Sequence, residues 1–187
     1  MKSSTRTIVY CALFAALTCA VAPLSIPLPG GVPITLQMVT VMLAGLILGA
    51  KLGFISQLIY VLLGLVGLPV FAGLTGGAAK LAGPSGGFII GFLFLAWLSG
   101  LLYFRLGRNK TGAARYAAIV FSVLVGCAAM YVFGLGWFMV STGRTLAEAF
   151  TLCMLPFIPG DLLKIVLVTV LVPQIEKAAG LAGSVSR

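Results

Sequence analysis

Six long apolar stretches with almost no charged residues divide this chain, and they constrain its fold more than any other feature. A bilayer core of about 30 Å is crossed by about 20 apolar helical residues, or by fewer where the membrane thins. We therefore predict an all-α integral membrane protein in which residues 1–187 form one domain of six transmembrane helices. The predicted spans are 8–24, 35–50, 52–68, 86–106, 116–140 and 159–177. Lys51 leaves room for only a tight turn between the second and third spans.

The composition supports a membrane environment and argues against several classes of function. Hydrophobic residues make up 61% of the chain and charged residues only 8%, a balance far from that of a soluble domain. Three acidic residues, no histidine and four cysteines without close pairing provide too few groups for a metal site, a carboxylate pair or a histidine triad. We expect no cofactor, no metal and no catalytic residue, so an intramembrane enzyme is the least favoured class of function.

The basic residues predict which ends of the spans face the cytoplasm. They are scattered between apolar runs, so the net charge of +9 does not indicate a nucleic-acid partner. With both termini in the cytoplasm, the outer segments carry only Lys80 and Arg144, as expected from the positive-inside rule. The predicted inner residues are Lys2, Arg6, Lys51, Arg105, Arg108, Lys110, Arg115, Lys177 and Arg187.

Two segments need separate interpretation. The first span resembles a secretory signal, because basic residues precede it and residues 20–22 (AVA) look like a cleavage site. Its apolar run is long and Pro23 follows it, so we expect a retained span. Between Thr145 and Leu155, a weaker amphipathic pattern predicts a short surface or re-entrant helix.

One predicted span carries charged side chains near its outer end. Pro159 suits the first helical turn, Asp161 favours the positive helix N-terminus, and Lys164 follows three residues later on the same face. Charges inside a span are costly and usually functional, so the pair predicts a ligand site with one acceptor and one donor. The alternatives are mutual neutralisation that locks the helix and, less favoured, a proton relay.

Other segments offer weaker signals. Residues 73–87 (GLTGGAAKLAGPSGG) predict a loop without P-loop spacing, which either folds over a ligand or is a plain connector. Thr35 and Gln37 suit a neutral polar ligand ring, although a helix N-cap and an interhelical hydrogen bond explain them equally well. Small residues recur every fourth position at 12–20, 45–53 and 83–91. These faces allow close helix packing, and the alanine face at 12–20 equally fits docking of a partner membrane subunit.

Four motifs together resemble the BioY family, the biotin-binding S components of energy-coupling factor (ECF) transporters. They are PITLQ at 33–37, GLPVFAG at 67–73, GPSGGFIIGF at 83–92 and PFIPGDLLK at 156–164. Their order and spacing match over essentially the whole chain, with Ser85 and Phe88 as mild departures. The resemblance implies an ECF S-component-like bundle with a ligand pocket near the outer face, in the bacterial cytoplasmic (inner) membrane. It assigns biotin recognition for uptake to Asp161 and Lys164.

The resemblance also implies partners and further contacts. It places Ala12 and Ala16 against a transmembrane coupling subunit that two cytoplasmic ATPase subunits power. Biotin's ureido ring has two N–H donors and one carbonyl acceptor, which suit the Asp161 carboxylate and the Lys164 ammonium. We expect Lys80 or Arg144 to meet the biotin carboxylate, and Leu68, Phe71, Phe88 and Phe92 to form apolar walls. The predicted binding residues are Thr35, Gln37, Phe71, Lys80, Gly86, Gly87, Phe88, Asp161 and Lys164.

Two other functions compete with this interpretation. An S component for another vitamin would share the fold but need different polar groups around its ligand. A proton-coupled secondary carrier would use Asp161 as its proton site, but the sequence lacks the paired inverted halves common in such carriers.

Overall fold

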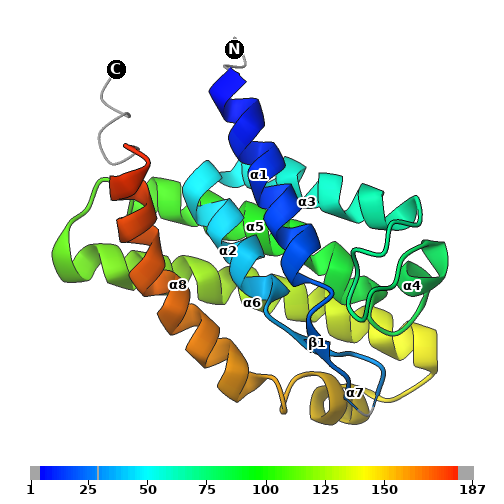
Figure 1. Ribbon diagram of the computed structural model, residues 1–187. Helices are drawn as coiled ribbons and strands as arrows, with labels where there is room; N and C mark the ends of the chain where they lie inside the picture. Colours follow the sequence, from blue (N-terminus) through cyan, green and yellow to red (C-terminus); the bar gives the residue numbers. More distant parts are fainter. Residues whose placement is uncertain (1–4, 29, 181–187) are drawn as a thin grey trace.

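The computed structural model describes residues 5–28 and 30–180, and the chain is almost entirely helical there (Figure 1). Its elements in these ranges are α1 Thr5–Val21, β1 Ser25–Ile26, β2 Ile34–Thr35, α2 Gln37–Leu48, α3 Ala50–Leu65, α4 Ala78–Ala82, α5 Gly86–Leu106, α6 Gly112–Thr142, α7 Leu146–Cys153 and α8 Ile158–Ala178. Each predicted span is a helix, and the largest shift is at α6, which begins at Gly112 rather than at residue 116. The amphipathic segment predicted before the last span is α7. Lys2, Arg187 and the Arg6 side chain lie outside the described part.

The six helices that correspond to the predicted spans differ in length. Within the described residues, α5, α6 and α8 are long and apolar enough to cross a membrane. The other three, α1, α2 and α3, are also apolar but shorter, at 10–17 residues in the searched part. A helical membrane protein is therefore confirmed, whereas six complete crossings stay a prediction.

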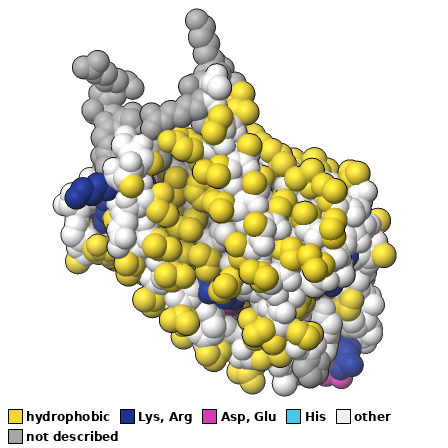
Figure 2. All heavy atoms as spheres, in the orientation of Figure 1, with side chains coloured by type: hydrophobic (Ala, Val, Ile, Leu, Met, Phe, Trp, Pro, Cys, Tyr) yellow, Lys and Arg dark blue, Asp and Glu magenta, His cyan; other side chains and the backbone are white. Residues whose placement is uncertain are grey.

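The bundle has two different ends (Figure 1). The start of α1, the α2–α3 junction, the α5–α6 connection and the end of α8 lie at one end, which we call the basic end because Lys51, Arg105, Lys110 and Lys177 belong to these elements. The β1–β2 hairpin, α4 and α7 lie at the opposite end. Between the ends, the face in Figure 2 is covered mainly by hydrophobic side chains, as expected for a surface in contact with lipid.

The turn between α2 and α3 lies at Gly49, not at Lys51 as the sequence suggested. Helix α2 ends at Leu48 and α3 begins at Ala50, so this single residue reverses the chain. Its φ of 82° lies in the left-handed region, which glycine adopts without the steric penalty of a Cβ. Lys51 is instead an exposed residue in the first turn of α3.

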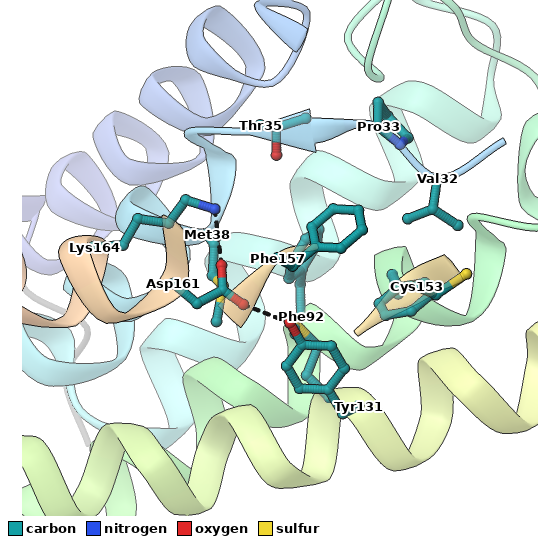
Figure 3. Close-up of a pocket in the computed structure, with 12 residues that line it drawn as sticks. Val32, Pro33, Thr35, Met38, Phe92, Tyr131, Cys153, Phe157, Asp161 and Lys164 are labelled. Atoms are coloured by element: carbon teal, nitrogen blue, oxygen red, sulfur yellow. Dashed lines mark hydrogen bonds and ion pairs between the residues drawn. The ribbon is translucent and has the colours of Figure 1, made fainter. Parts of the chain in front are cut away.

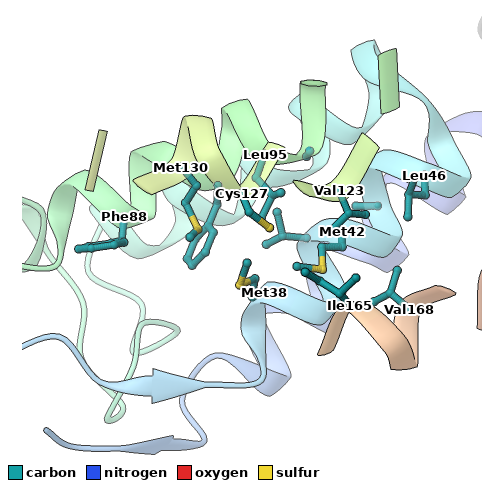
Figure 4. Close-up of a cluster of buried hydrophobic side chains, with 14 of the residues drawn as sticks. Met38, Met42, Leu46, Phe88, Leu95, Val123, Cys127, Met130, Ile165 and Val168 are labelled. Atoms are coloured by element: carbon teal, nitrogen blue, oxygen red, sulfur yellow. The ribbon is translucent and has the colours of Figure 1, made fainter. Parts of the chain in front are cut away.

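The largest cluster of buried hydrophobic side chains lies where α2, α5, α6 and α8 meet (Figure 4). Met42, Leu95, Val123 and Val168 from these four helices are each fully buried. Toward the hairpin end, the same cluster continues to Phe88, which lines the cavity described below. The core therefore fixes the walls of the candidate site.

Close contacts between α2, α3 and α5 depend on glycine. A Cβ at Gly45 would lie 2.4 Å from the Ala96 carbonyl oxygen, and one at Gly53 would lie 2.9 Å from the Gly45 Cα. A Cβ at Gly100 would lie 2.6 Å from the Gly45 carbonyl oxygen. The small face predicted in the second span therefore packs the chain's own bundle.

We expect Gly45→Ala to lower the free energy of unfolding by about 1–3 kcal/mol, because the added methyl group overpacks a backbone contact. Unfolding by denaturing detergent, followed by circular dichroism, measures the change. Gly136→Ala is the matched control, because a Cβ at this α6 position meets no atom within 4 Å. Equal stability of the two variants would contradict the packing assigned to Gly45.

A buried charged cluster ties α5, α6 and α8 together toward the basic end. The Tyr103 hydroxyl donates to Glu176 Oε2 at 3.0 Å, and Arg115 Nε donates to the Tyr103 oxygen at 3.1 Å. The Arg115 guanidinium also forms an ion pair with Glu176 Oε2. Glu176 is only 1% exposed, so its charge depends on these two partners.

Candidate ligand-binding site

Asp161 and Lys164 lie near the start of α8, at the end of the bundle opposite the basic end. Pro159 occupies the first turn, as predicted, where its missing N–H leaves no helical hydrogen bond unmade. Asp161 Oδ1 accepts a hydrogen bond from Lys164 Nζ at 2.9 Å, and Oδ2 accepts one from the Tyr131 hydroxyl of α6 at 2.5 Å (Figure 3). Asp161 and Lys164 are each 7% exposed. The carboxylate is thus oriented from both sides.

This arrangement leaves hydrogen-bonding capacity toward a ligand. An ionised carboxylate has about four acceptor positions and an ammonium has three donors. Among the described residues, Asp161 accepts two side-chain hydrogen bonds and Lys164 donates one. The Tyr131 oxygen, having donated its proton, can still accept. The three side chains therefore offer acceptors and donors side by side.

A cavity of about 380 Å³, its mouth included, opens in front of Asp161. We call it the first chamber. Its walls are mainly apolar and aromatic, with few polar groups, which is the usual composition of a small-molecule site. It is lined by Val32, Pro33, Thr35, Met38, Phe88, Phe92, Met130, Tyr131, Cys153, Phe157, Asp161 and Lys164.

A second chamber adjoins the first and shares five lining residues with it: Val32, Pro33, Thr35, Phe88 and Phe92. Its further lining residues are Gln37, Tyr60, Ala72, Lys80, Ser85 and Ile89. Because they share these residues, the two chambers lie side by side, and we call them together the elongated site. The Asp161–Lys164 pair lies at one end and Lys80 at the other.

Six of the nine predicted binding residues line this elongated site. Asp161 and Lys164 line the first chamber, Gln37 and Lys80 line the second, and Thr35 and Phe88 line both. Gln37 thus lies at the Lys80 end of the site and not at the Asp161 end, although the sequence suggested that it meets the polar ring of the ligand. Of the predicted apolar walls, Phe92 lines both chambers, whereas Leu68 is 47% exposed in the loop after α3.

The other three predicted binding residues lie behind the cavity wall. Phe71 is fully buried and packs edge-to-face on Tyr60, with ring centroids 5.5 Å apart. Gly64 makes room for it, because a Cβ there would lie 2.1 Å from the Phe71 ring. Gly86 and Gly87 allow the start of α5 to approach the Leu81 backbone and Trp137 closely. These residues shape the site, and their contact with a ligand stays a prediction.

Comparison with known proteins identifies the family. A sequence profile described as the BioY family matches residues 1–180. This chain belongs to the BioY family. It is 41% identical over 165 residues to the probable biotin transporter BioY of Pyrococcus horikoshii, covering 88% of this chain and 93% of that protein. It is 42% identical over 170 residues to the biotin transporter BioY of Rhodobacter capsulatus, covering 86% and 88%.

A solved structure supports the same assignment. The crystal structure of the S-component for biotin from an ECF-type ABC transporter superposes on this BioY chain with a TM-score of 0.83. The two sequences are 34% identical, and the match covers 92% of this chain and 91% of the other. The predicted ECF S-component fold is therefore confirmed.

Three segments of this BioY chain lie at the end of the bundle opposite the basic end: the β1–β2 hairpin, the connection that contains α4, and α7 (Figure 1). The segment that contains α4 was expected only as a loop. At the hairpin tip, an added Cβ at Gly30 would touch Leu152 of α7, and one at Gly31 would touch Pro84. The segments therefore contact one another, and each contributes a residue to the lining of the chambers.

A capping box begins α7 and fixes the third of these segments. The Thr145 N–H donates to Glu148 Oε2 at 2.9 Å, and the Glu148 N–H donates to the Thr145 hydroxyl at 3.4 Å. The Thr145 backbone and hydroxyl, with a smaller effect of Arg144, lower the pKa of Glu148. The cap is therefore weakened only as the pH falls through this lowered pKa. Arg144 is exposed and pairs with Glu148 at 3.8 Å, so it does not line either chamber.

Two tyrosines of the site, Tyr131 and Tyr60, were not predicted from the sequence of this BioY chain. Tyr131 lies in the apolar α6 and reaches Asp161 across 30 positions of sequence. Tyr60 lies in α3, where its neighbours are also apolar. In the sequence, each is simply a tyrosine within a predicted span. Tyrosines are also common at the membrane–water interface, so their presence alone did not indicate a ligand site.

Proposed function

We propose that this protein is the biotin-capture subunit, or S component, of an ECF transporter in the bacterial cytoplasmic membrane. The observation that carries the proposal is the buried Asp161 carboxylate, held by Lys164 and Tyr131 on the wall of an apolar chamber. The names of the relatives and of the solved structure support biotin as the ligand. The protein binds and carries its ligand and catalyses no reaction.

The first chamber holds the ureido ring. Asp161 accepts from a ring N–H and Lys164 donates to the ureido oxygen, so the donors and acceptors match in number and kind. Tyr131 keeps Asp161 in place and accepts from the second ring N–H. Phe88 and Phe92 pack against the tetrahydrothiophene ring and the start of the valeryl chain. Ligands without this donor–acceptor pattern leave buried polar groups unpaired and bind weakly.

The valeryl chain extends into the second chamber, toward Lys80. Lys80 lines that chamber, whereas Arg144 is exposed and paired with Glu148, so Lys80 is the stronger of the two candidates for the ligand carboxylate. Thr35, on the shared wall, lies along the path between the two ends. The outer segments close over the ligand.

Helix α1 docks the transmembrane coupling subunit. Ala12, Ala16 and Ala20 are all exposed, although small residues of this kind usually pack inside a bundle. Exposed leucines flank them, which leaves a smooth apolar face for another membrane helix.

Six helices cross the membrane, and both termini are cytoplasmic. Two ATPase subunits, bound to the coupling subunit, supply the energy for uptake.

Uptake of labelled biotin into cells tests this function. Cells that express the chain together with an ECF coupling module should accumulate biotin when ATP is present, even after a protonophore collapses the proton gradient. Ala16→Trp should abolish uptake but leave biotin binding by the purified protein unchanged, because the change lies on the docking face. Ala117→Trp, at an exposed position of α6 that lines neither chamber, is the control for a bulky residue on the helix surface. Uptake that needs the proton gradient and no ATPase would instead support a secondary carrier.

A further inference from the structure

Two buried polar atoms in the second chamber have no hydrogen-bond partner in the part of the chain that the structure describes. Among the described residues, Tyr60 Oη and Gln37 Nε2 are both unpaired, and their side chains belong to residues that are 0% and 3% exposed. Both residues line the second chamber, and their polar groups lie close to each other but do not meet the geometry of a hydrogen bond. A buried polar group without a partner lowers stability by about 1–3 kcal/mol, so such groups in native proteins usually meet a ligand or an ordered water.

The two side chains are held in place for a ligand. The Tyr60 ring packs edge-to-face on Phe71, with an interplanar angle of 79°, and Phe71 is itself fixed against Gly64. Gln37 is the first residue of α2, and its side chain is buried where that helix begins. Neither group can turn to solvent to satisfy its hydrogen-bonding capacity.

The chemistry of the chamber defines the ligand group. A tyrosine hydroxyl, a glutamine amide and the Lys80 ammonium supply hydrogen-bond donors to one small space. Of the described residues that line the second chamber, none is acidic. A cluster of donors with a single positive charge suits a carboxylate. A neutral donor makes its strongest hydrogen bonds to an ionised acceptor, and a carboxylate is such an acceptor.

We propose that Tyr60 and Gln37, together with Lys80, form a carboxylate subsite that selects ligands with a free carboxylate on their tail. The subsite deepens the proposed function and rests on it, because the ligand then binds with its ring at Asp161 and its carboxylate at Tyr60. Tyr60 is the specificity-determining residue, because its hydroxyl is the polar group that α3 contributes to the described lining of the second chamber. A ligand with a neutral tail leaves the tyrosine and glutamine donors unpaired and binds more weakly than one with a carboxylate.

Equilibrium binding of two ligands to the purified protein tests this subsite. One ligand is biotin, and the other is an analogue whose valeryl chain ends in a methyl group instead of the carboxylate. Tyr60→Phe should weaken biotin binding about tenfold or more, the effect of losing one hydrogen bond to a charged group. It should leave binding of the methyl-terminated analogue unchanged, which also shows that the variant is folded. Gln37→Met should show the same selectivity.

Tyr116→Phe is the matched control, because it removes a hydroxyl from a tyrosine that is 45% exposed on α6. It should change neither affinity. Unchanged biotin affinity in Tyr60→Phe, or an equal loss for both ligands, would overturn the carboxylate subsite while leaving biotin capture intact. If folded native protein bound neither ligand, the proposed function would fail and the subsite with it.

Discussion

Asp161→Asn is expected to weaken biotin binding about 100-fold or more, because losing one member of a buried, hydrogen-bonded charge pair costs about 2–5 kcal/mol. The change removes the negative charge and replaces one of the two acceptor oxygens with an amide donor. It also leaves the Lys164 ammonium, 7% exposed, without its anionic partner. Isothermal titration calorimetry with biotin measures the loss.

The matched control for Asp161→Asn is Glu148→Gln, which neutralises an exposed carboxylate at the same end of the bundle. Glu148 lines neither chamber, so biotin affinity should stay within about twofold of the native value, as expected for a surface substitution away from the site. A native-like affinity in folded Asp161→Asn would show that the Asp161–Lys164 pair only locks α8 in place.

Glu176→Ala is expected to lower the free energy of unfolding by about 3–5 kcal/mol, the usual effect of breaking a buried ion pair from one side. The substitution leaves the Arg115 guanidinium, only 18% exposed, without its counter-charge, and removes the acceptor for the Tyr103 hydroxyl. Because these groups join three helices, the lower stability should be seen as unfolding of the whole bundle at a lower concentration of denaturing detergent.

Arg144→Ala provides the contrast for Glu176→Ala. It breaks an ion pair in which both side chains are about half exposed, at 48% and 49%, and such pairs contribute only about 0–1 kcal/mol. If Glu176→Ala and Arg144→Ala were equally stable, the cluster toward the basic end would have no special role in holding α5, α6 and α8 together.

Local features of the site could be predicted from the sequence because they depend on helical spacing alone. Asp161 and Lys164 lie three residues apart on one helix, so their contact follows from α-helical geometry once the helix is recognised. Pro159 marked where that helix begins. The apolar length of each stretch likewise predicted the helices.

The rest of the site depends on tertiary packing, which spacing does not encode. Tyr131 reaches Asp161 only because α6 passes beside α8, and Gln37 joins Lys80 rather than Asp161 because the α4 segment folds toward the start of α2. Phe71 was predicted as a cavity wall from its motif, but the glycine at position 64 lets its ring sink behind Tyr60. The turn at Gly49 was misplaced by two residues because Lys51 was the more visible interruption.

The central claim is that the elongated site captures biotin, and titration of biotin into the purified native protein tests it most directly. The account predicts saturable binding at one site per chain, with no displacement by vitamins that lack a ureido ring and a carboxylate tail. Folded native protein that bound no biotin, or that bound another vitamin more tightly, would contradict it.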